Sequence, residues 1–434
     1  MAPEEDGIAV GTEKLKMSKV LSQNFQLLLN PKQVRSEPYA LKGRDGILNI
    51  EALRRARSEI VSWPGYRPTK LRSLKGLAAT AGISSILYKD EGARFGLGSF
   101  KALGGAYAVA SYLQGAVEAR TGVRPSTADL AAGKLRDLTS SITVTCATDG
   151  NHGRSVAWGA QNFGCRCIIY VHAAVSQGRR DAIAAYGADV TIVAGTYDDA
   201  VRQAAEDAAA NGWQVVSDTS YEGYTEVPRY VMQGYGIIMD EIVDQLPKGV
   251  FPTHVFVQGG VGGLAASICS YLWERFADKS PMLFVAEPEK ARCLLLSAKA
   301  GRPTSDEGPL DTIMAGLACG EVSLLAWNIL DEGADGFIAI EDEAAAETMR
   351  VLAEGRFGDE PIVAGESAVA GLAAMLLLAE EPETRPPVKL DSNSVVLVIG
   401  TEGATDPTVY SEIVGRPAET VVPGWASAQA LEAV

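Results

Sequence analysis

Histidine is rare in this chain of 434 residues, and long apolar runs are absent from it. With only three histidines, and six cysteines that lack zinc-type spacing, a metal site is not expected. A transmembrane helix needs about 20 apolar residues, and the longest run, around 368–379, reads as a core helix. The opening MAPEEDGIAV has neither the basic start nor the apolar centre of a signal peptide. We therefore expect a cytoplasmic protein with reduced cysteines and no membrane partner.

Basic residues are outnumbered, since 39 Lys and Arg face 54 Asp and Glu and the net charge is −15. This balance argues against nucleic acid or an anionic membrane as a partner. A small anionic substrate would need a local positive site, which backbone amides at a helix N-terminus can supply. With 47% hydrophobic residues, the chain is long enough for two domains with large cores.

From about residue 142, short β-branched runs alternate with helical stretches. The expected strands are nearly continuous in apolar residues, as in parallel sheets covered on both faces, so we predict an α/β protein built from βαβ units. The first 45 or so residues lack clear periodicity and are expected to wrap the surface or a partner subunit. The expected strands are 142–148, 166–172, 189–193, 213–217, 253–258, 282–286 and 394–399, the expected helices are 151–163, 177–186, 197–211, 228–245, 264–276 and 366–380, and the expected loops are 118–140, 297–311 and 381–393.

The first of five polar or glycine-rich turns is Phe95-Gly-Leu-Gly-Ser-Phe-Lys101, which opens a helix. A lysine just inside such a helix has a fixed stem, while its amine can swing between an aldehyde and a substrate carbon. Burial is expected to lower the pKa of Lys101 enough for it to act as a nucleophile and then as a base. Read alone, Lys101 could equally be an ordinary solvated lysine, since about a quarter of a domain is charged.

Two further turns carry acids directly after expected strands. In Ala147-Thr-Asp-Gly-Asn-His-Gly153 the polar residues lie where α/β sheets bind ligands, and the amides of the next helix could bind a carboxylate. Asn151 could equally be only the helix N-cap, and Asp149 only a loop residue. In the turn that begins at Ser217, Asp218 is either an acid–base group or a residue that forms a turn and caps a helix.

The run Gln258-Gly-Gly-Val-Gly-Gly263 also follows an expected strand, and its amides could converge on a phosphate. A P-loop is excluded, because Leu264-Ala265 stands where Lys-Ser/Thr is needed. A dinucleotide fingerprint fits Gly260-Val-Gly-Gly-Leu-Ala265, with Glu287 as the ribose-binding acid. This run alone does not separate NAD from a phosphorylated cofactor.

The last turn, Gly400-Thr-Glu-Gly-Ala-Thr-Asp406, follows the final strand and either closes a pocket or is merely a turn. In a parallel sheet the turns that follow the strands gather at one edge. The five turns together therefore predict one shared site.

Together these motifs resemble the fold-type II pyridoxal-phosphate (PLP) enzymes, the relatives of tryptophan synthase β chains and of serine and threonine dehydratases. Within them the chain resembles the diaminopropionate ammonia-lyases, from about residue 40 to 415. The motifs that carry this resemblance are Tyr88-Lys-Asp-Glu91, Arg94-Phe-Gly-Leu97, Phe100-Lys101, the run 147–153, Asp218-Thr219, Glu222-Gly-Tyr224, Met232-Gln-Gly-Tyr235 and Met314-Ala-Gly-Leu-Ala-Cys-Gly-Glu321.

The resemblance implies two domains, each with a mainly parallel sheet flanked by helices, with the cofactor in the cleft between them. Residues 46–100 and 219–434 would form a large PLP-binding domain, 101–218 a small domain, and 1–45 an N-terminal extension. It also implies a homodimer that acts on a small amino acid.

By the same resemblance, Lys101 is the Schiff-base lysine, Gly259–Gly263 the phosphate cup, and Asn151 the partner of the PLP 3′-oxygen. The cofactor contacts implied are Phe100, Lys101, Asn151, Gly259, Gly260, Val261, Gly262, Gly263, Gly400 and Thr401. The substrate contacts implied are Ser99, Thr148, Asp149, His152, Tyr221 and Glu321.

The residue at position 149 makes the resemblance specific to the ammonia-lyases. Serine and threonine dehydratases have a small neutral or hydroxyl residue there, whereas the ammonia-lyases have Asp. The resemblance implies that Asp149 and Lys101 remove the α-proton from opposite faces, so that both enantiomers react. Asp218 would protonate the departing amine or recognise it as an ammonium.

The sequence departs from the family pattern at two places. Gly98 and Ser99 stand where Asn and Ala are expected. Gly400 stands where a hydroxyl residue usually meets the pyridine nitrogen, a contact that could shift to Thr401. Cys293 and Cys319 fall where some relatives bring two cysteines near the site entrance, although a cytosolic chain argues against a disulfide.

The predicted function is PLP-dependent elimination of ammonia from D- or L-2,3-diaminopropionate. The alternative is a PLP-dependent dehydratase or lyase for 3-hydroxyaspartate, serine or threonine, or a β-replacement synthase. Asp149 and Asp218 favour amine elimination, while Gly98 and Gly400 leave room for the alternative. An NAD-dependent oxidoreductase explains only one of the five turns. An inactive PLP-binding protein is disfavoured by the intact Lys101.

Overall fold

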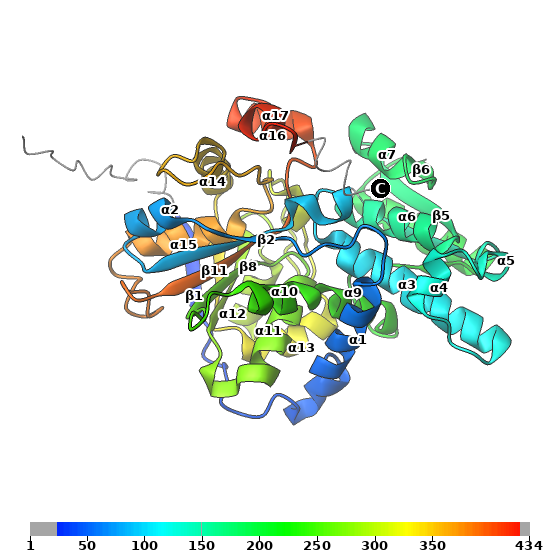
Figure 1. The fold of residues 1–434 in the computed structure, drawn as a ribbon, viewed down its shortest axis with the longest axis horizontal. Helices are drawn as coiled ribbons and strands as arrows, with labels where there is room; N and C mark the ends of the chain where they lie inside the picture. The colour runs from blue at the N-terminus through cyan, green and yellow to red at the C-terminus, as the bar shows by residue number, and fades with distance from the viewer. Residues whose placement is uncertain (1–23, 149, 426–434) are drawn as a thin grey trace, which may run out of the picture.

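Two β-sheets form the framework of the computed structural model, which describes residues 24–148 and 150–425 (Figure 1). The larger sheet has the strand order β1-β10-β9-β8-β11-β3-β2, and the smaller sheet has the order β6-β5-β4-β7. All neighbours in the smaller sheet are parallel, whereas the larger sheet has antiparallel edge strands, β1 and β2, around five parallel ones. The predicted α/β class with two mainly parallel sheets is confirmed.

The strands of the larger sheet are β1 (Phe25–Leu29), β10 (Gly336–Ile340), β9 (Met282–Pro288), β8 (His254–Gln258), β11 (Val395–Gly400), β3 (Ser85–Asp90) and β2 (Lys70–Ser73), and those of the smaller are β6 (Asp189–Val193), β5 (Arg166–His172), β4 (Thr143–Ala147) and β7 (Gln214–Val215). The α-helices are α1 (Ile50–Ile60), α2 (Lys75–Ala81), α3 (Lys101–Thr121), α4 (Thr127–Ala131), α5 (Arg136–Thr139), α6 (Asn151–Phe163), α7 (Gln177–Ala184), α8 (Tyr197–Asn211), α9 (Glu226–Tyr235), α10 (Ile237–Gln245), α11 (Gly263–Phe276), α12 (Cys293–Ala300), α13 (Leu324–Gly333), α14 (Asp342–Glu354), α15 (Ala370–Glu380), α16 (Pro407–Val414) and α17 (Ala418–Val421). Short 3-10 helices are η1 (Leu41–Gly46), η2 (Glu91–Gly96), η3 (Ala277–Lys279) and η4 (Ala315–Leu317).

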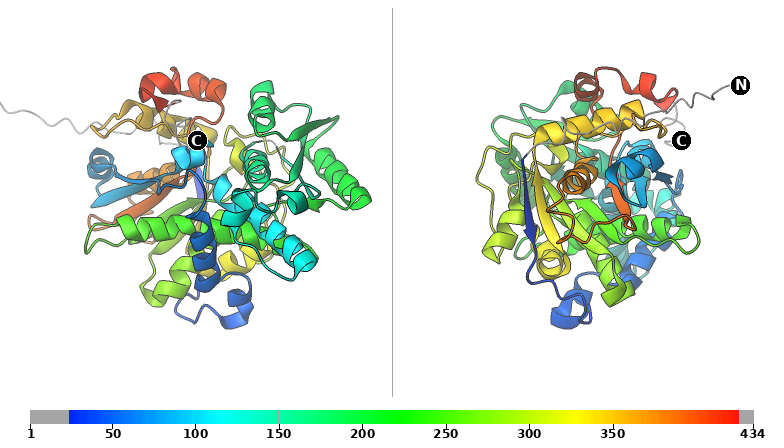
Figure 2. Two further views of the ribbon diagram at one scale, coloured as in Figure 1. Left: turned by 45° about the vertical axis from the view of Figure 1, so that its right-hand side comes forward. Right: turned by 90° about the vertical axis from the view of Figure 1, so that its left-hand side faces the viewer.

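Helices cover both faces of the larger sheet, and each face has its own apolar core (Figure 2). Along β11, Leu397 and Ile399 join the core that contains residues of α3, α9 and α11, whereas Val396 and Val398 join the core with α2, α14 and α15. This alternation follows from the period of two along a strand. The first core continues into the smaller sheet through residues of β4 and β5.

Most expected elements are present, with differences at their ends. The strands predicted at 166–172 and 189–193 and the helix predicted at 197–211 have the bounds of β5, β6 and α8. The predicted helix 228–245 is wrong in one respect, because it breaks at Gly236 into α9 and α10, where the Leu53 side chain packs closely against the backbone. The predicted helix 366–380 begins only at residue 370.

Other predictions missed structure. Residues 118–140 were expected to be a loop, yet they contain the end of α3 and the short helices α4 and α5; α12 likewise extends into the expected loop 297–311. The N-terminal segment contributes β1, which pairs antiparallel with β10 and closes one edge of the larger sheet. Its Phe-Gln-Leu-Leu-Leu sequence lacks an apolar–polar alternation, so periodicity gave no sign of it. Among the described residues no helix is long and apolar enough to cross a membrane.

Candidate active site

Four of the five turns make direct contacts with one another. The Phe100 amide donates to the Thr401 carbonyl at 3.0 Å, and the Gly403 amide donates to the Gly98 carbonyl at 2.9 Å, so the turns before α3 and after β11 pair as short antiparallel segments. From the smaller sheet, Asn151 Nδ2 donates to the Glu402 carboxylate. Lys101 Nζ reaches across to Asp218. The turns thus meet between the two sheets and not at one edge of a single sheet as predicted, because those that begin at Ala147 and Ser217 follow β4 and β7 of the smaller sheet.

The glycine turn after β8 is joined to the others through Tyr235. The Tyr235 ring packs against Phe100 with ring centroids 4.7 Å apart, and a Cβ on Gly263 would lie 3.9 Å from its Cε2. The fully buried Tyr235 hydroxyl lies beside Lys101, whose charge acts on its pKa. Sequence reasoning quoted Tyr235 as part of a motif but assigned it no place in the site.

An ion pair stands at the centre of the site. Lys101 Nζ lies 2.7 Å from Asp218 Oδ2, and both side chains are about four-fifths buried. Burial alone would lower the pKa of Lys101, but the Asp218 carboxylate raises it above its usual range. Burial alone would raise the pKa of Asp218, and Lys101 instead holds it well below its usual value. The expectation that burial would lower the pKa of Lys101 is therefore wrong, because a carboxylate faces the amine.

His152 lies next to this pair, on α6. Its Nε2 is 2.8 Å from the Val216 carbonyl, which fixes the ring. Its Nδ1 is 3.9 Å from Asp218 Oδ2 and has no hydrogen-bond partner among the described residues. Burial lowers the pKa of His152, although Asp218 acts in the opposite direction. A neutral imidazole nitrogen therefore faces the site.

The start of α6 differs from one expectation. Asn151 was considered as the N-cap of this helix, but its side chain turns away to Glu402. The buried Thr148 hydroxyl instead accepts the amides of Gly150 and Gly153, at 3.2 and 3.3 Å. Thr148 thereby shapes the turn, and Asn151 is left to face the site. Asp149 lies outside the described residues.

The glycine turn 259–263 has the geometry of an anion site. Gly260 and Gly262 have φ angles of +57° and +96°, which side-chain-bearing residues rarely adopt. Gly262 is the N-cap of α11, so the first amides of this helix have no partner within the helix. The carbonyl of Val261 accepts from the Ser323 amide at 2.9 Å, which holds the turn. These amides and the helix dipole suit a phosphate.

Glu287 does not serve as a ribose-binding acid. It is fully buried and accepts the amides of Leu294 and Leu295 at 2.9 and 2.8 Å, which ties it to the start of α12. Burial raises its pKa to about 8. The dinucleotide interpretation therefore loses its second element.

The remaining expected contacts lie at different depths. Ser99 is buried and pairs with Glu402, but Tyr221 is 56% exposed and stacks on Tyr224. Glu321 is exposed, so the structure does not bring it to the centre of the site. Neither Cys293 nor Cys319 forms a disulfide among the described residues, and the Cys293 thiol faces the Gly260 carbonyl at 3.6 Å.

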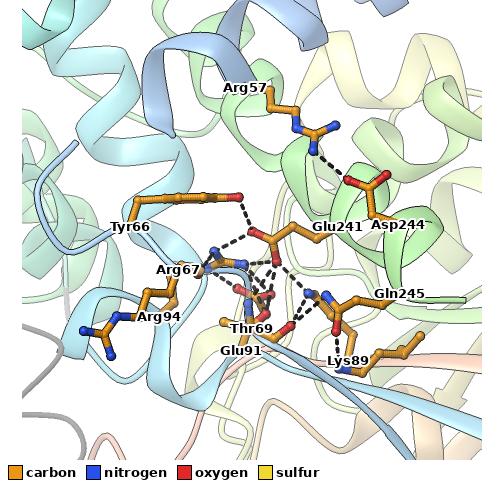
Figure 3. A network of polar contacts seen from close by, with 11 residues as sticks. Arg57, Tyr66, Arg67, Thr69, Lys89, Glu91, Arg94, Glu241, Asp244 and Gln245 are labelled. Carbon is orange, nitrogen blue, oxygen red and sulfur yellow. Dashed lines mark hydrogen bonds and ion pairs between the residues drawn. The ribbon is translucent and has the colours of Figure 1, made fainter. Parts of the chain in front are cut away.

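A buried charge network supports the turn before Lys101 (Figure 3). Arg94, in η2, donates to Glu91 and to both oxygens of Glu241, at 2.7–2.8 Å. Lys89 Nζ donates to the same Glu241 at 2.6 Å. Four charges of balanced sign are thus buried together and attach β3 and η2 to α10. The motif residues 88–97 had been quoted for the family resemblance, but nothing in their spacing indicated Glu241 as the partner.

Comparison with known proteins accounts for this arrangement. A family model described as pyridoxal-phosphate dependent enzyme matches residues 62–400, so the chain belongs to this family. PLP is therefore its cofactor, and the predicted fold-type II architecture is confirmed.

Within the family, the chain is similar to diaminopropionate ammonia-lyase. The Escherichia coli K12 enzyme is 41% identical over 367 residues, covering 83% of this chain and 90% of that protein. The Salmonella typhimurium LT2 enzyme is 39% identical over 365 residues, covering 82% and 90%. A crystal structure of the holo Escherichia coli enzyme has a TM-score of 0.82 and 37% identity, covering 91% of this chain and 97% of the other. A second, with an aminoacrylate-PLP azomethine intermediate, has a TM-score of 0.80 and 38% identity over 91% and 98%.

The residues present fit PLP. Lys101 offers the amine for its aldehyde, and the start of α11 offers amides without a partner in the helix for its phosphate. His152 Nδ1 is a buried acceptor without a partner among the described residues. Asn151, positioned by Glu402, is a polar side chain on the smaller-sheet side.

Proposed function

We propose that this protein eliminates ammonia from 2,3-diaminopropionate, which with water gives pyruvate and two molecules of ammonia. The observation that carries the proposal is the contact of 2.7 Å between Lys101 Nζ and Asp218 Oδ2. It places a second acid–base group beside the lysine that would hold the cofactor. An amine leaves poorly unless it is protonated, so a proton carrier near the β-carbon is needed. Two diaminopropionate ammonia-lyases at 41% and 39% identity support the same substrate.

Each residue would have a defined task. When bound, PLP supplies the electron sink that makes the α-proton acidic. Lys101 would anchor the cofactor and, once released, carry the α-proton on one face. Asp218 would pass a proton to the leaving amine, and Thr148 and Ser99 would orient the substrate. The proposal for Asp149, as the base on the opposite face, rests on the sequence alone.

A dehydratase for serine, threonine or 3-hydroxyaspartate, or a β-replacement synthase, is the second candidate. Two observations favour it. The Escherichia coli ammonia-lyase was also solved in complex with D-serine, with 38% identity to this chain. In addition, the L-threonine dehydratase of Mycobacterium leprae is 27% identical over 292 residues.

A substrate panel separates the two candidates. The holoenzyme is given D- and L-diaminopropionate, serine, threonine and 3-hydroxyaspartate, and keto acid and ammonia are measured together. We expect kcat/KM for diaminopropionate to exceed that for the hydroxy amino acids by roughly 100-fold or more, because the site recognises a charged amine. We also expect two ammonia molecules for each pyruvate. A preference for a hydroxy amino acid, with one ammonia per keto acid, would favour the dehydratase.

The same panel tests Asp149. We expect Asp149→Asn to lose activity on one enantiomer of diaminopropionate roughly 100-fold more than on the other, the usual scale for a lost base. Equal losses on both enantiomers would refute the assignment to opposite faces.

Three coarser expectations are also proposed. The division into 46–100 with 219–434 and 101–218 is supported by the sheets, since all four strands of the smaller sheet lie within 101–218. A cytoplasmic location is supported by six cysteines that form no disulfide in the described part of the chain. A homodimer is supported by the exposed Leu29 and Leu41 in the N-terminal segment. Light scattering of the holoenzyme would test the dimer.

A further inference from the structure

The hydroxyl group of Tyr235 is a buried polar group of the site to which no described residue is hydrogen-bonded. Tyr235 is the last residue of α9 and is 1% exposed, and its hydroxyl makes no hydrogen bond within residues 24–148 and 150–425. A buried hydroxyl without a partner is unfavourable, and most such groups have one. The Tyr235 hydroxyl therefore points to a group that binds it in another state of the site.

Two glycines bring the Tyr235 ring against the start of α3. A Cβ on Gly104 would lie 2.4 Å from Tyr235 Cε1 and 2.7 Å from its Cζ, and a Cβ on Gly234 would lie 1.9 Å from the Leu103 carbonyl oxygen. Interiors are close-packed, so α3 and α9 approach this closely only because both residues are glycine. Gly104 follows Lys101 by three positions, so the hydroxyl end of the ring lies on the face of α3 that carries Lys101.

The Phe100 ring contacts both the phenol and the amine of Lys101. Its centroid lies 4.7 Å from that of Tyr235 and 5.5 Å from Lys101 Nζ. The charge of the amine acts on the Tyr235 hydroxyl, and the hydroxyl in turn acts on the amine. The Lys101 amine thus has Asp218 at 2.7 Å and, close by, a phenol without a hydrogen-bond partner among the described residues.

The Tyr235 hydroxyl is a neutral group in these surroundings. Burial raises the pKa of Tyr235 well above its ordinary value, Asp218 acts in the same direction, and Lys101 opposes the rise. His152 and Cys319 also lie near the amine. A neutral phenol can accept a hydrogen bond from an amine or donate one to it, and it does not itself act as a base.

A lysine that removes the α-proton has to be neutral, and the Asp218 carboxylate works against this by favouring the ammonium form of Lys101. In the proposed function Asp218 serves the leaving amine, so the Lys101 amine needs another partner at that moment. The phenol fits this need. One amine N–H can donate to the Tyr235 oxygen while the nitrogen lone pair stays free for the α-proton.

We propose that Tyr235 is a positioning residue for Lys101, and that its hydroxyl holds the lysine amine while Asp218 serves the leaving group. This role rests on the proposed function. The Lys101 lone pair takes up the α-proton, Asp218 gives its proton to the leaving amine, and Tyr235 neither gains nor loses a proton. Lys101 and Asp218 then form an ammonium–carboxylate pair, which is the contact that the structure shows.

The first test removes the hydroxyl from the holoenzyme. We expect Tyr235→Phe to lower kcat on diaminopropionate by roughly three- to tenfold, as for one lost hydrogen bond, with less than about a twofold change in KM. We also expect the kinetic isotope effect of α-deuterated substrate to rise, because proton transfer to Lys101 becomes slower. A residue that only fills space would not raise this isotope effect.

Tyr410→Phe is the matched control for this substitution. The Tyr410 hydroxyl is also buried without a hydrogen bond among the described residues, but it lies in the core on the other face of the larger sheet. Its removal should change neither kcat nor the isotope effect.

A second readout needs no leaving group. Alanine cannot eliminate ammonia from its β-carbon, so the holoenzyme can only exchange the α-proton of alanine with solvent, which NMR in D₂O records. We expect Tyr235→Phe to slow this exchange by roughly three- to tenfold. Failure of the proposed function would look different, because the unaltered protein would then exchange the α-proton of alanine without releasing ammonia from diaminopropionate.

A third readout involves no amino acid. When PLP is added back to protein freed of it, visible absorption follows the capture of its aldehyde by Lys101. We expect this capture to be roughly three- to tenfold slower in Tyr235→Phe, because the amine is no longer held, while the Kd for PLP changes by less than about threefold.

Gly104→Ala tests the same contact with the hydroxyl still present, and it serves if Tyr235→Phe fails to fold. Its Cβ would displace the Tyr235 ring. We expect this variant to slow both the exchange of alanine and the capture of PLP. Tyr235→Phe combined with Gly104→Ala should cause little further loss than either change alone, since both break one contact.

Two results would contradict this role of Tyr235. One is that Tyr235→Phe leaves the exchange of alanine and the capture of PLP unchanged. The other is that the Kd for PLP rises by roughly tenfold, the scale of a lost hydrogen bond, while the isotope effect stays the same. The hydroxyl would then bind the phosphate, because the ring also lies beside the turn 259–263, 3.9 Å from a Cβ on Gly263.

Discussion

Asp218 forms an ion pair with Lys101, and we propose that it also protonates the leaving amine. A substitution at Asp218 tests both roles. We expect Asp218→Asn to lower the pKa of Lys101, because the carboxylate that favours the ammonium form is removed. We also expect kcat on diaminopropionate to fall by roughly 10²–10⁴-fold, the usual contribution of a general acid, with a smaller change in KM. The pH profile of kcat and the visible absorption of bound PLP distinguish lost catalysis from lost cofactor.

Asp189→Asn is the control for this substitution, since Asp189 is an exposed carboxylate on β6, within the same sheet. It should leave kcat and PLP binding unchanged. If Asp218→Asn kept the kcat of the unaltered protein, the leaving amine would have to receive its proton from another group.

Whether the sequence could predict the place of a site residue depends on whether that place is set by neighbouring residues or by residues far away in the sequence. Lys101 and Asp218 stand in turns that sequence motifs identify, but these turns follow strands of different sheets, so their meeting depends on how the two sheets pack together. The Asn151 contact with Glu402 and the raised pKa of Lys101 depend on residues more than 100 positions apart. Tyr88 entered the sequence analysis only as part of a motif, and nothing in its spacing indicated that its side chain lies against Gly400.

At the scale of elements, the charge network of Lys89, Glu91, Arg94 and Glu241 determines how η2 and α3 are held. Burial alone would raise the pKa of Glu241, but Arg94 and Lys89 lower it from 4.5 to about 2. Because the folded pKa is depressed, the contact stabilises the protein above pH 4.5 and is lost as the pH falls from there toward 2. The network therefore predicts acid sensitivity that originates at this junction.

We expect Glu241→Gln to reduce the free energy of unfolding by about 3 kcal/mol, because two buried cations are left facing one carboxylate. Urea unfolding near pH 7 measures the loss, and the difference from the unaltered protein should shrink as the pH falls toward 2. Glu51→Gln, which breaks an exposed pair with Arg55, should cost less than about 0.5 kcal/mol. Equal effects of the two substitutions would mean that the network contributes no more than a surface pair.

Elements were predictable where their pattern was strong. The strands β5 and β6 and the helix α8 could be placed from periodicity and caps, whereas β1 could not, since its edge position, paired only with β10, imposes no alternation. At the break between α9 and α10, Leu53 of α1 packs against Gly236, a contact between distant residues that local sequence does not reveal.

At the scale of the whole molecule, the two sheets are joined across the site by Arg179 of α7. Its Nε lies 3.2 Å from Asp406 Oδ2, and its Nη2 lies 3.9 Å from the buried Glu366. Burial, with the neighbouring Glu402, raises the pKa of Glu366 to about 8, and Arg179 opposes this rise. Asp406 also caps α16, so Arg179 attaches the smaller sheet's helices to the segment that follows β11.

These contacts join a helix of the smaller sheet to residues beside the larger sheet. We therefore expect Arg179→Gln to weaken the contact between the two sheets without changing the reacting groups. KM for diaminopropionate should rise by about three- to tenfold, the net scale of one hydrogen bond, while kcat changes less. Hydrogen exchange should increase in α7 and in residues 402–406. Arg180→Gln is the matched control, because the Arg180 side chain donates within its own helix, to Gln177. If the Arg179 substitution lowered kcat and left KM and exchange unchanged, the arginine would act on the reacting groups and the two sheets would be held together by other contacts.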